Sequence, residues 1–183
     1  MKKFLIILFC LCLLTGCTNN NLWFATPNLE KYDLTQQTIN TSIQTQFHLD
    51  DYKKEIGKTI YEQDGYYIQI SNIIPSEDDY EVYLKFVGKN NKQIKSIRSL
   101  EKFNLTTQTY SLAVKPIIIV SADNKKFESE EHWNSFSNIS NGFEYSYFIF
   151  NSDDKKELLL NPQNVVVTIK LNKLIEQTWL IKE

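Results

Sequence analysis

Apolar and polar residues alternate with a period of two along much of the chain. In residues 41–49 the side chains of Ile43, Thr45, Phe47 and Leu49 alternate with those of Gln44, Gln46 and His48. Successive side chains of a strand point to opposite faces, so this pattern predicts a strand with one face on a core and the other in water. Residues 80–87 alternate in the same way and predict a second strand of this kind.

The clearest predicted hairpin spans residues 60–70. Asp64-Gly65 lies between two alternating runs and supplies the pair of positive-φ residues that a two-residue turn needs. Further strands are predicted over residues 93–97, 105–114, 117–120, 143–150, 165–171 and 176–181. Residues 88–91 are expected to turn the chain from the strand over 80–87 into the one over 93–97.

Little helix is expected in the mature chain. Short helices fit the sequence at residues 53–58, 127–137 and 173–175. Residues 122–142 form the longest segment without a strand pattern, and irregular segments of this length are usually functional or mobile.

About eight or nine short strands at hairpin spacing predict a mainly β fold, an antiparallel β-sandwich. The stretch EVYLKFVGKNNKQIKSI (81–97) resembles a hairpin of immunoglobulin-like envelope domains, although the Cys-Trp-Cys core of antibody domains is missing. An immunoglobulin-like sandwich is therefore expected over residues 29–183 as a single domain. A closed lipocalin-type β-barrel, which would enclose a cavity, is the alternative.

The first sixteen residues predict a lipoprotein signal peptide. Lys2 and Lys3 precede an apolar run of eleven residues (4–14), which as a helix is about 16 Å long, too short to span a bilayer. Leu14-Thr15-Gly16-Cys17 resembles the lipobox of bacterial lipoproteins. That resemblance implies cleavage before Cys17, a diacylated thiol and often an acylated α-amine. Two or three acyl chains anchor a protein stably.

Cleavage at Cys17 leaves residues 18–183 without a cysteine, and so without disulfides or thiolate ligands. Without Lys2 and Lys3, eighteen basic residues face 22 acidic ones, a net charge of −4. A mildly acidic surface with Arg98 as the only arginine argues against binding of nucleic acid and against electrostatic docking on anionic lipid. The acyl chains are then the expected connection to the membrane.

Residues 17–28 are interpreted as the lipidated cysteine and a tether. Trp23 and Phe24 are unusual in a tether. They are expected to pack back on the domain, to lie at the membrane interface or to fill a groove of a partner. Thr18 is not the aspartate that resembles an inner-membrane retention signal. In a Gram-negative cell this predicts the outer membrane, on its periplasmic leaflet by default.

No catalytic or metal-binding motif is recognised, and we expect no enzyme activity and no cofactor. His48 lies on the polar face of its predicted strand. His132 follows Glu128, Glu130 and Glu131, but metal ligands usually converge from several elements, and solvated charges explain this loop equally well. Adjacent acids such as Asp50-Asp51 lie beside turn residues and lysines, where carboxylates are normally solvated.

Aromatic residues are the remaining candidates for function. Residues 143–150 carry aromatic side chains on both faces, as expected of a central strand covered by the partner sheet. The alternative is an exposed aromatic surface that binds a partner and includes Trp133 and Phe136, because aromatic side chains are enriched where proteins bind partners. We therefore expect a non-catalytic interaction module, either an accessory subunit of an envelope assembly or an immunity or inhibitor lipoprotein. The alternative is a small-ligand binder with a pocket lined by Tyr66, Tyr145 and Tyr147.

Overall fold

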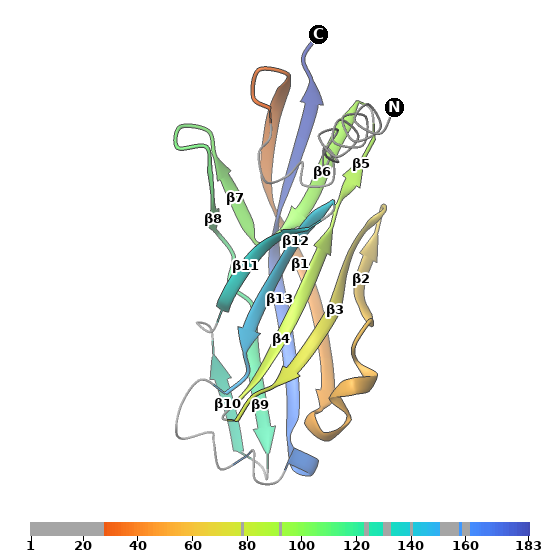
Figure 1. Cartoon of the computed structure of the whole chain (residues 1–183), viewed down its shortest axis with the longest axis vertical. Coiled ribbons are helices and arrows are strands. Elements are labelled where there is room, and N and C mark those ends of the chain that lie inside the picture. Colours follow the sequence, from red (N-terminus) through yellow and green to blue (C-terminus); the bar gives the residue numbers. More distant parts are fainter. Residues whose placement is uncertain are drawn as a thin grey trace, which may run out of the picture.

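The protein is mainly β, as the sequence predicts, and forms an elongated antiparallel β-sandwich (Figure 1). The structure is a computed structural model that describes residues 28–77, 79–91, 93–122, 125–129, 133–139, 141–150, 158 and 162–183, with the backbone alone at 129, 133–136 and 138. Two sheets pack on one another and a two-stranded hairpin accompanies them. Within these ranges neither sheet closes into a barrel, so the barrel alternative is wrong.

Sheet A is built around β13, a strand of 16 residues. Its order is β10-β9-β13-β6-β5, and β1 pairs with the other edge of β13. The strands are β1 (Tyr32–His48), β5 (Lys89–Asn90), β6 (Ile94–Ser99), β9 (Ile117–Ala122), β10 (Lys125–Ser129) and β13 (Val166–Ile181). One edge of β13 pairs first with β9 and then with β6, so two strands share that edge end to end.

Sheet B has the order β11-β12-β4-β3-β2. The strands are β2 (Thr59–Gln63), β3 (Tyr66–Pro75), β4 (Tyr80–Val87), β11 (Trp133–Ile139) and β12 (Gly142–Phe148). The predicted hairpin at Asp64-Gly65 is confirmed: the two residues have φ of 54° and 80° and connect β2 to β3. The alternation in residues 41–49 is also confirmed, because Ile43, Thr45, Phe47 and Leu49 are buried whereas Gln44, Gln46 and His48 are exposed.

The third unit is the hairpin of β7 (Glu101–Asn104) and β8 (Thr109–Leu112), which connects β6 to β9. Its turn points to the same end of the sandwich as the C-terminus (Figure 1). Since β6 and β9 pair with different halves of β13, the hairpin leaves sheet A where the pairing of β13 passes from one strand to the other.

The chain changes sheets at Gly88. β4 belongs to sheet B, whereas β5 and β6 belong to sheet A, so the turn expected at residues 88–91 does not join two strands of one hairpin. A Cβ on Gly88 would lie 2.1 Å from the carbonyl oxygen of Ser96, which explains the glycine. The resemblance to an immunoglobulin-like hairpin therefore rested on two strands of different sheets.

The helices expected at 127–137 and 173–175 are wrong. β10 and β11 cover most of the former segment, and with them much of residues 122–142 is strand rather than irregular. Residues 173–175 lie inside β13. Leu174 and Ile175 are adjacent and both buried, so apolar and polar residues do not alternate in this part of the strand. Near residues 53–58 the chain forms the 3-10 helix η2 (Leu49–Lys54), and a second one, η4 (Pro162–Asn164), precedes β13.

One hydrophobic core joins the inner faces of the two sheets. The core residues of sheet A are mostly aliphatic, whereas those of sheet B include several aromatic residues. The largest fully buried side chains are Trp179, Tyr145, Tyr147, Phe86, Phe143 and Phe150. Because no disulfide is expected in the mature chain, this core has to supply most of the stability.

Candidate functional site

The residues singled out by the sequence fall in two places. Cys17, Trp23 and Phe24 lie outside the described residues. Trp133 and Phe136 are on β11, where their positions are opposite Tyr147 and Tyr145 of β12. β11 ends sheet B, since among the described residues it pairs with β12 alone.

The tyrosines expected to line a ligand pocket fill the core instead. Tyr66, Tyr145 and Tyr147 are 6%, 0% and 2% exposed. Tyr145 packs edge-on against Phe86 at 5.1 Å between ring centroids, and the hydroxyl of Tyr66 lies 2.7 Å from Oγ of Ser96. These three rings therefore form no pocket of the kind that a ligand-binding barrel requires.

A line of aromatic rings crosses from sheet A to sheet B through the β7-β8 hairpin. Successive centroids are separated by 5.3 Å from Trp179 to Phe103, 4.8 Å from Phe103 to Tyr110, 5.0 Å from Tyr110 to Phe143, and 6.4 Å from Phe143 to Tyr145. All are edge-to-face contacts, each worth about 1 kcal/mol beyond the area it buries. The hairpin supplies the second and third rings, Phe103 and Tyr110, and so holds the sheets together at this end.

Side-chain amides attach β7 to sheet A in place of a backbone ladder. Gln36 on β1 donates from Nε2 to the carbonyl of Phe103 at 2.9 Å and accepts from its N–H at 2.8 Å. Gln177 on β13, fully buried, donates to the carbonyl of Glu101 at 2.7 Å. These three hydrogen bonds satisfy backbone groups of β7 that face the sheet.

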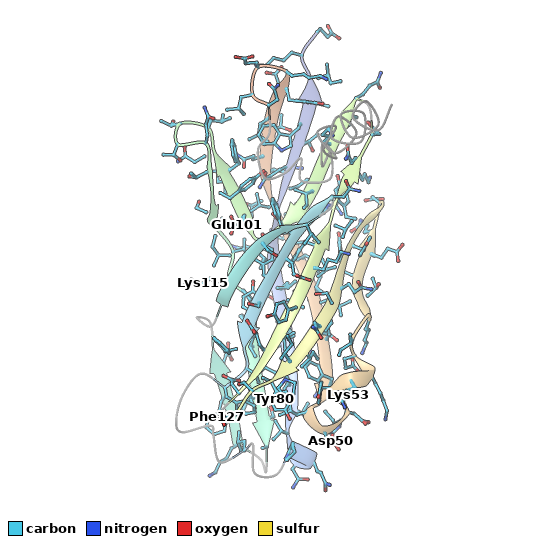
Figure 2. The ribbon with its side chains drawn as sticks, viewed as in Figure 1. Asp50, Lys53, Tyr80, Glu101, Lys115 and Phe127 are labelled. Atoms are coloured by element: carbon cyan, nitrogen blue, oxygen red, sulfur yellow. The ribbon has the colours of Figure 1, made fainter. Side chains whose placement is uncertain are left out.

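A buried carboxyl lies at the base of the hairpin. Figure 2 labels Glu101 beside the start of β7. Its side chain is 5% exposed, and burial raises the pKa of its carboxyl from 4.5 to about 7. Burial, and after it the charge of Glu101, raises the pKa of the hydroxyls of Tyr110 and Tyr147. Burial and then the charge of Glu101 also raise the pKa of the Tyr145 hydroxyl. We call Glu101 and these three tyrosines the Glu101 cluster.

Several polar atoms around the Glu101 cluster lack a hydrogen-bond partner among the described residues. They are Oη of Tyr110, Oη of Tyr147 and Oε1 of Gln177. Each buried polar atom without a partner costs about 1 to 3 kcal/mol. Sequence analysis singled out Tyr145 and Tyr147 of this cluster but not Glu101, because Glu101 falls between two predicted strands in a pattern that resembles a solvated turn.

Arg98 is the centre of a second polar group. Its Nε donates to Glu176 at 2.8 Å and its Nη1 to the hydroxyl of Tyr61 at 2.6 Å, while Cζ lies 4.3 Å from the ring centroid of Tyr66. Nη2 is 3.7 Å from Asp64. Tyr61, Asp64 and Tyr66 come from the β2-β3 hairpin, so the guanidinium joins sheet B to sheet A. This arrangement is structural, with every charge near an opposite one.

β1 forms a long open edge of sheet A. Across the described part of the chain, β1 pairs with β13 alone. The N–H of Leu49 donates to the carbonyl oxygen of Val165, the residue before β13, at 2.9 Å. Leu49 and Val165 therefore form a hydrogen-bonded pair at the end of the β1-β13 ladder. Because bonded and non-bonded pairs alternate along an antiparallel ladder, Gln44 and Gln46 direct their backbone N–H and C=O groups to the open side. Residues 34–47 contain no charged residue and no proline.

Apart from the irregularity that the register shift between Asn40 and Ile43 marks, this open edge lacks the charges and prolines that often protect one. Natural edge strands carry lysines, prolines or inward charges that prevent pairing with other chains. β1 has a register shift between Asn40 and Ile43, and on either side of it the polar side chains are threonine, asparagine, serine and glutamine. An extended segment of another chain can therefore pair with β1 without meeting a charge.

The remaining candidates provide no further site. His48 is exposed, and His132 lies outside the described residues. No group of three or more potential metal ligands occurs in the parts of the chain that the structure describes. A surface hollow of about 350 Å³ is lined by Gln36, Lys102, Phe103, Asn104, Leu105 and Ser111 beside the β7-β8 hairpin. Over the same ranges no helix has the length and apolar character needed to span a bilayer.

Comparison with known proteins adds no relative. No protein-family profile matches the chain, and neither does any curated protein or solved structure. The candidate sites are therefore defined by geometry: the open edge of β1, the edge strand β11, and the Glu101 cluster under its hairpin.

Proposed function

We propose that the protein is a lipid-anchored lipoprotein of the bacterial cell envelope, and that its β domain is a non-catalytic interaction module. Cys17 is the lipidated residue, and an envelope protein is the partner. The module serves as an accessory subunit of an envelope assembly or as an immunity or inhibitor lipoprotein. In a Gram-negative cell the anchor belongs to the outer membrane, on the periplasmic side.

The open edge of β1 is the observation that carries this proposal. An edge strand offers a row of backbone donors and acceptors, and a partner segment that adds to the sheet gains affinity from main-chain hydrogen bonds. The uncharged run over residues 34–47 leaves this row available. The packed aromatic core supports binding at the surface over binding in an internal pocket.

Cross-linking in intact cells tests the interaction module. A photoreactive amino acid at position 44 of the tagged, lipidated protein is expected to give one discrete adduct with an envelope protein. Gln44→Lys together with Gln46→Lys places two charges on the open edge and should abolish the complex. Gln93→Lys, the same change at an exposed position in the turn between β5 and β6, should retain it.

Two results would change the proposal. A complex that survives the changes at Gln44 and Gln46 but is lost with Trp133→Ala and Phe136→Ala would move the binding surface to β11. The absence of any stoichiometric partner for the wild-type protein would overturn the interaction module itself.

A further inference from the structure

One end of the sandwich brings the first described residues next to the last ones. Tyr32 is opposite Ile181, and the N–H of Lys182 bonds the carbonyl of Lys31 at 2.9 Å. Nζ of Lys182 also donates to the carbonyl of Leu29 at 2.7 Å. Figure 1 shows the turn of the β7-β8 hairpin at this same end. We call it the terminal end.

Exposed apolar side chains gather at the terminal end. Six large apolar side chains are exposed in the described part of the chain. Four of them belong here: Ile94, Leu105, Leu180 and Ile181, with exposed fractions of 38%, 55%, 40% and 37%. Ile94 and Leu180 are directly opposed on β6 and β13, and Leu105, the most exposed, lies in the hairpin turn. The other two are Ile56, which follows η2, and Ile74, next to the last residue of β3. Figure 1 shows η2 and the end of β3 at the opposite end of the long axis.

Lysines accompany these apolar side chains. Lys102 and Leu105 line the same surface hollow, and Lys31 is close enough to Lys95 for its charge to lower the pKa of Lys95, after burial as the larger cause. Glu30, Asp33 and Glu183 are at the same end, and Asp33 lies 3.9 Å from Nζ of Lys182. Apolar side chains among charges of both signs suit the headgroup region of a bilayer better than a wholly aqueous surface.

We infer that the terminal end faces the bilayer and inserts Leu105 and Leu180 into its headgroup region. The inference rests on the proposed anchor at Cys17. Ten residues, 18–27, separate Cys17 from Asn28 and reach at most about 36 Å when fully extended. The terminal end is therefore kept near the lipid surface. At such an effective concentration, contacts too weak to hold a free protein suffice to orient a tethered one.

Fluorescence quenching by lipids tests this orientation. The lipidated protein is reconstituted into vesicles of phosphatidylethanolamine and phosphatidylglycerol that contain acyl chains with nitroxide quenchers. Leu105→Cys and Leu180→Cys each introduce one thiol for an environment-sensitive dye, because residues 18–183 have no cysteine. Ile56→Cys and Ile74→Cys are matched controls, since these side chains are 40% and 41% exposed at the other end.

Dyes at positions 105 and 180 are expected to lose emission in the quencher vesicles and to shift to shorter wavelength, while dyes at 56 and 74 keep the emission they have in plain buffer. Equal quenching at all four positions, or none at any position of a vesicle-bound protein, would overturn the orientation and leave the anchor intact. A protein that does not float with the vesicles would instead overturn the anchor, and the orientation with it.

Discussion

The side chain of Gln36 pairs with the backbone of Phe103 as a neighbouring strand would, through one donated and one accepted hydrogen bond of 2.9 and 2.8 Å. β1 and β7 are 67 residues apart along the chain at this contact. The pairing fixes the β7-β8 hairpin over Trp179 and completes the line of rings between the sheets.

Gln36→Ala is expected to lower the free energy of unfolding by about 2 kcal/mol, because it leaves the N–H and C=O of Phe103 without their partner. Chemical denaturation of the soluble domain measures this change. Gln37→Ala, at the next and exposed position, is the control and should change stability by less than about 0.5 kcal/mol. Equal losses in the two variants would contradict a specific role for Gln36.

Glu101→Gln is expected to change how stability depends on pH. The pKa of Glu101 is raised from 4.5 to about 7, so between these values the folded protein holds a proton that the unfolded chain has lost. Stability should therefore fall as pH rises from about 4.5 to about 7, by about 3 kcal/mol in all. Glutamine does not ionise, so the variant should lack this decrease.

Denaturation series at pH 5 and pH 8 separate the two proteins. The wild type and Glu101→Gln should have similar stability at the lower pH, and the variant should be the more stable at the higher pH. If the stability of the two proteins changed equally between pH 5 and pH 8, the carboxyl of Glu101 would not be buried in the protonated form.

Arg98→Ala should destabilise the domain by about 2 to 3 kcal/mol, since Glu176 and the hydroxyl of Tyr61 lose a partly buried donor. Arg98→Lys should recover only part of the loss, because one ammonium group does not reproduce the planar fork. Lys54→Ala removes an exposed ion pair with Asp51 and is expected to leave the thermal midpoint unchanged. If Arg98→Lys were as stable as the wild type, the positive charge of Arg98 would be sufficient and the shape of the guanidinium would not matter.

Two glycines provide a matched test of the change of sheet. Gly88→Ala places a Cβ 2.1 Å from the carbonyl oxygen of Ser96, and we expect a loss of about 3 kcal/mol, as for severe overpacking. Gly57→Ala has no atom within 4 Å but a φ of +89°, so it should cost only about 1 kcal/mol. Thermal unfolding compares the two, and an equal cost would mean that the chain bends freely at Gly88.

Cys17→Ser tests the anchor that the lipobox predicts. The variant should lose labelling by a fatty-acid analogue and leave the membrane fraction, because the acyl chains supply the membrane affinity. Metabolic labelling and cell fractionation measure both effects. Undiminished labelling of the serine variant would contradict lipidation at this cysteine.

Local features of the sequence were sufficient for the fold class. The alternation from Ile43 to Leu49 and the turn at Asp64-Gly65 depend on side-chain direction and on the conformations available to neighbouring residues, so they are written in a few consecutive positions. The lipobox prediction is also local, but it rests on the resemblance of Leu14-Thr15-Gly16-Cys17 to bacterial lipoproteins. The strands in residues 122–142 were missed because their apolar pattern is weak and pairing with β9 and β12 stabilises them.

Only the tertiary structure decided which strands are neighbours and which side chains are buried together. The sequence does not indicate that the chain changes sheets at Gly88, because the close approach to Ser96 involves backbone from a different strand. Glu101 reads as a turn residue, yet it is buried beneath a hairpin that side chains from β1 and β13 hold in place. The open edge of β1 is also a tertiary property, because a strand is an edge strand only if the folded sheet leaves one of its sides unpaired.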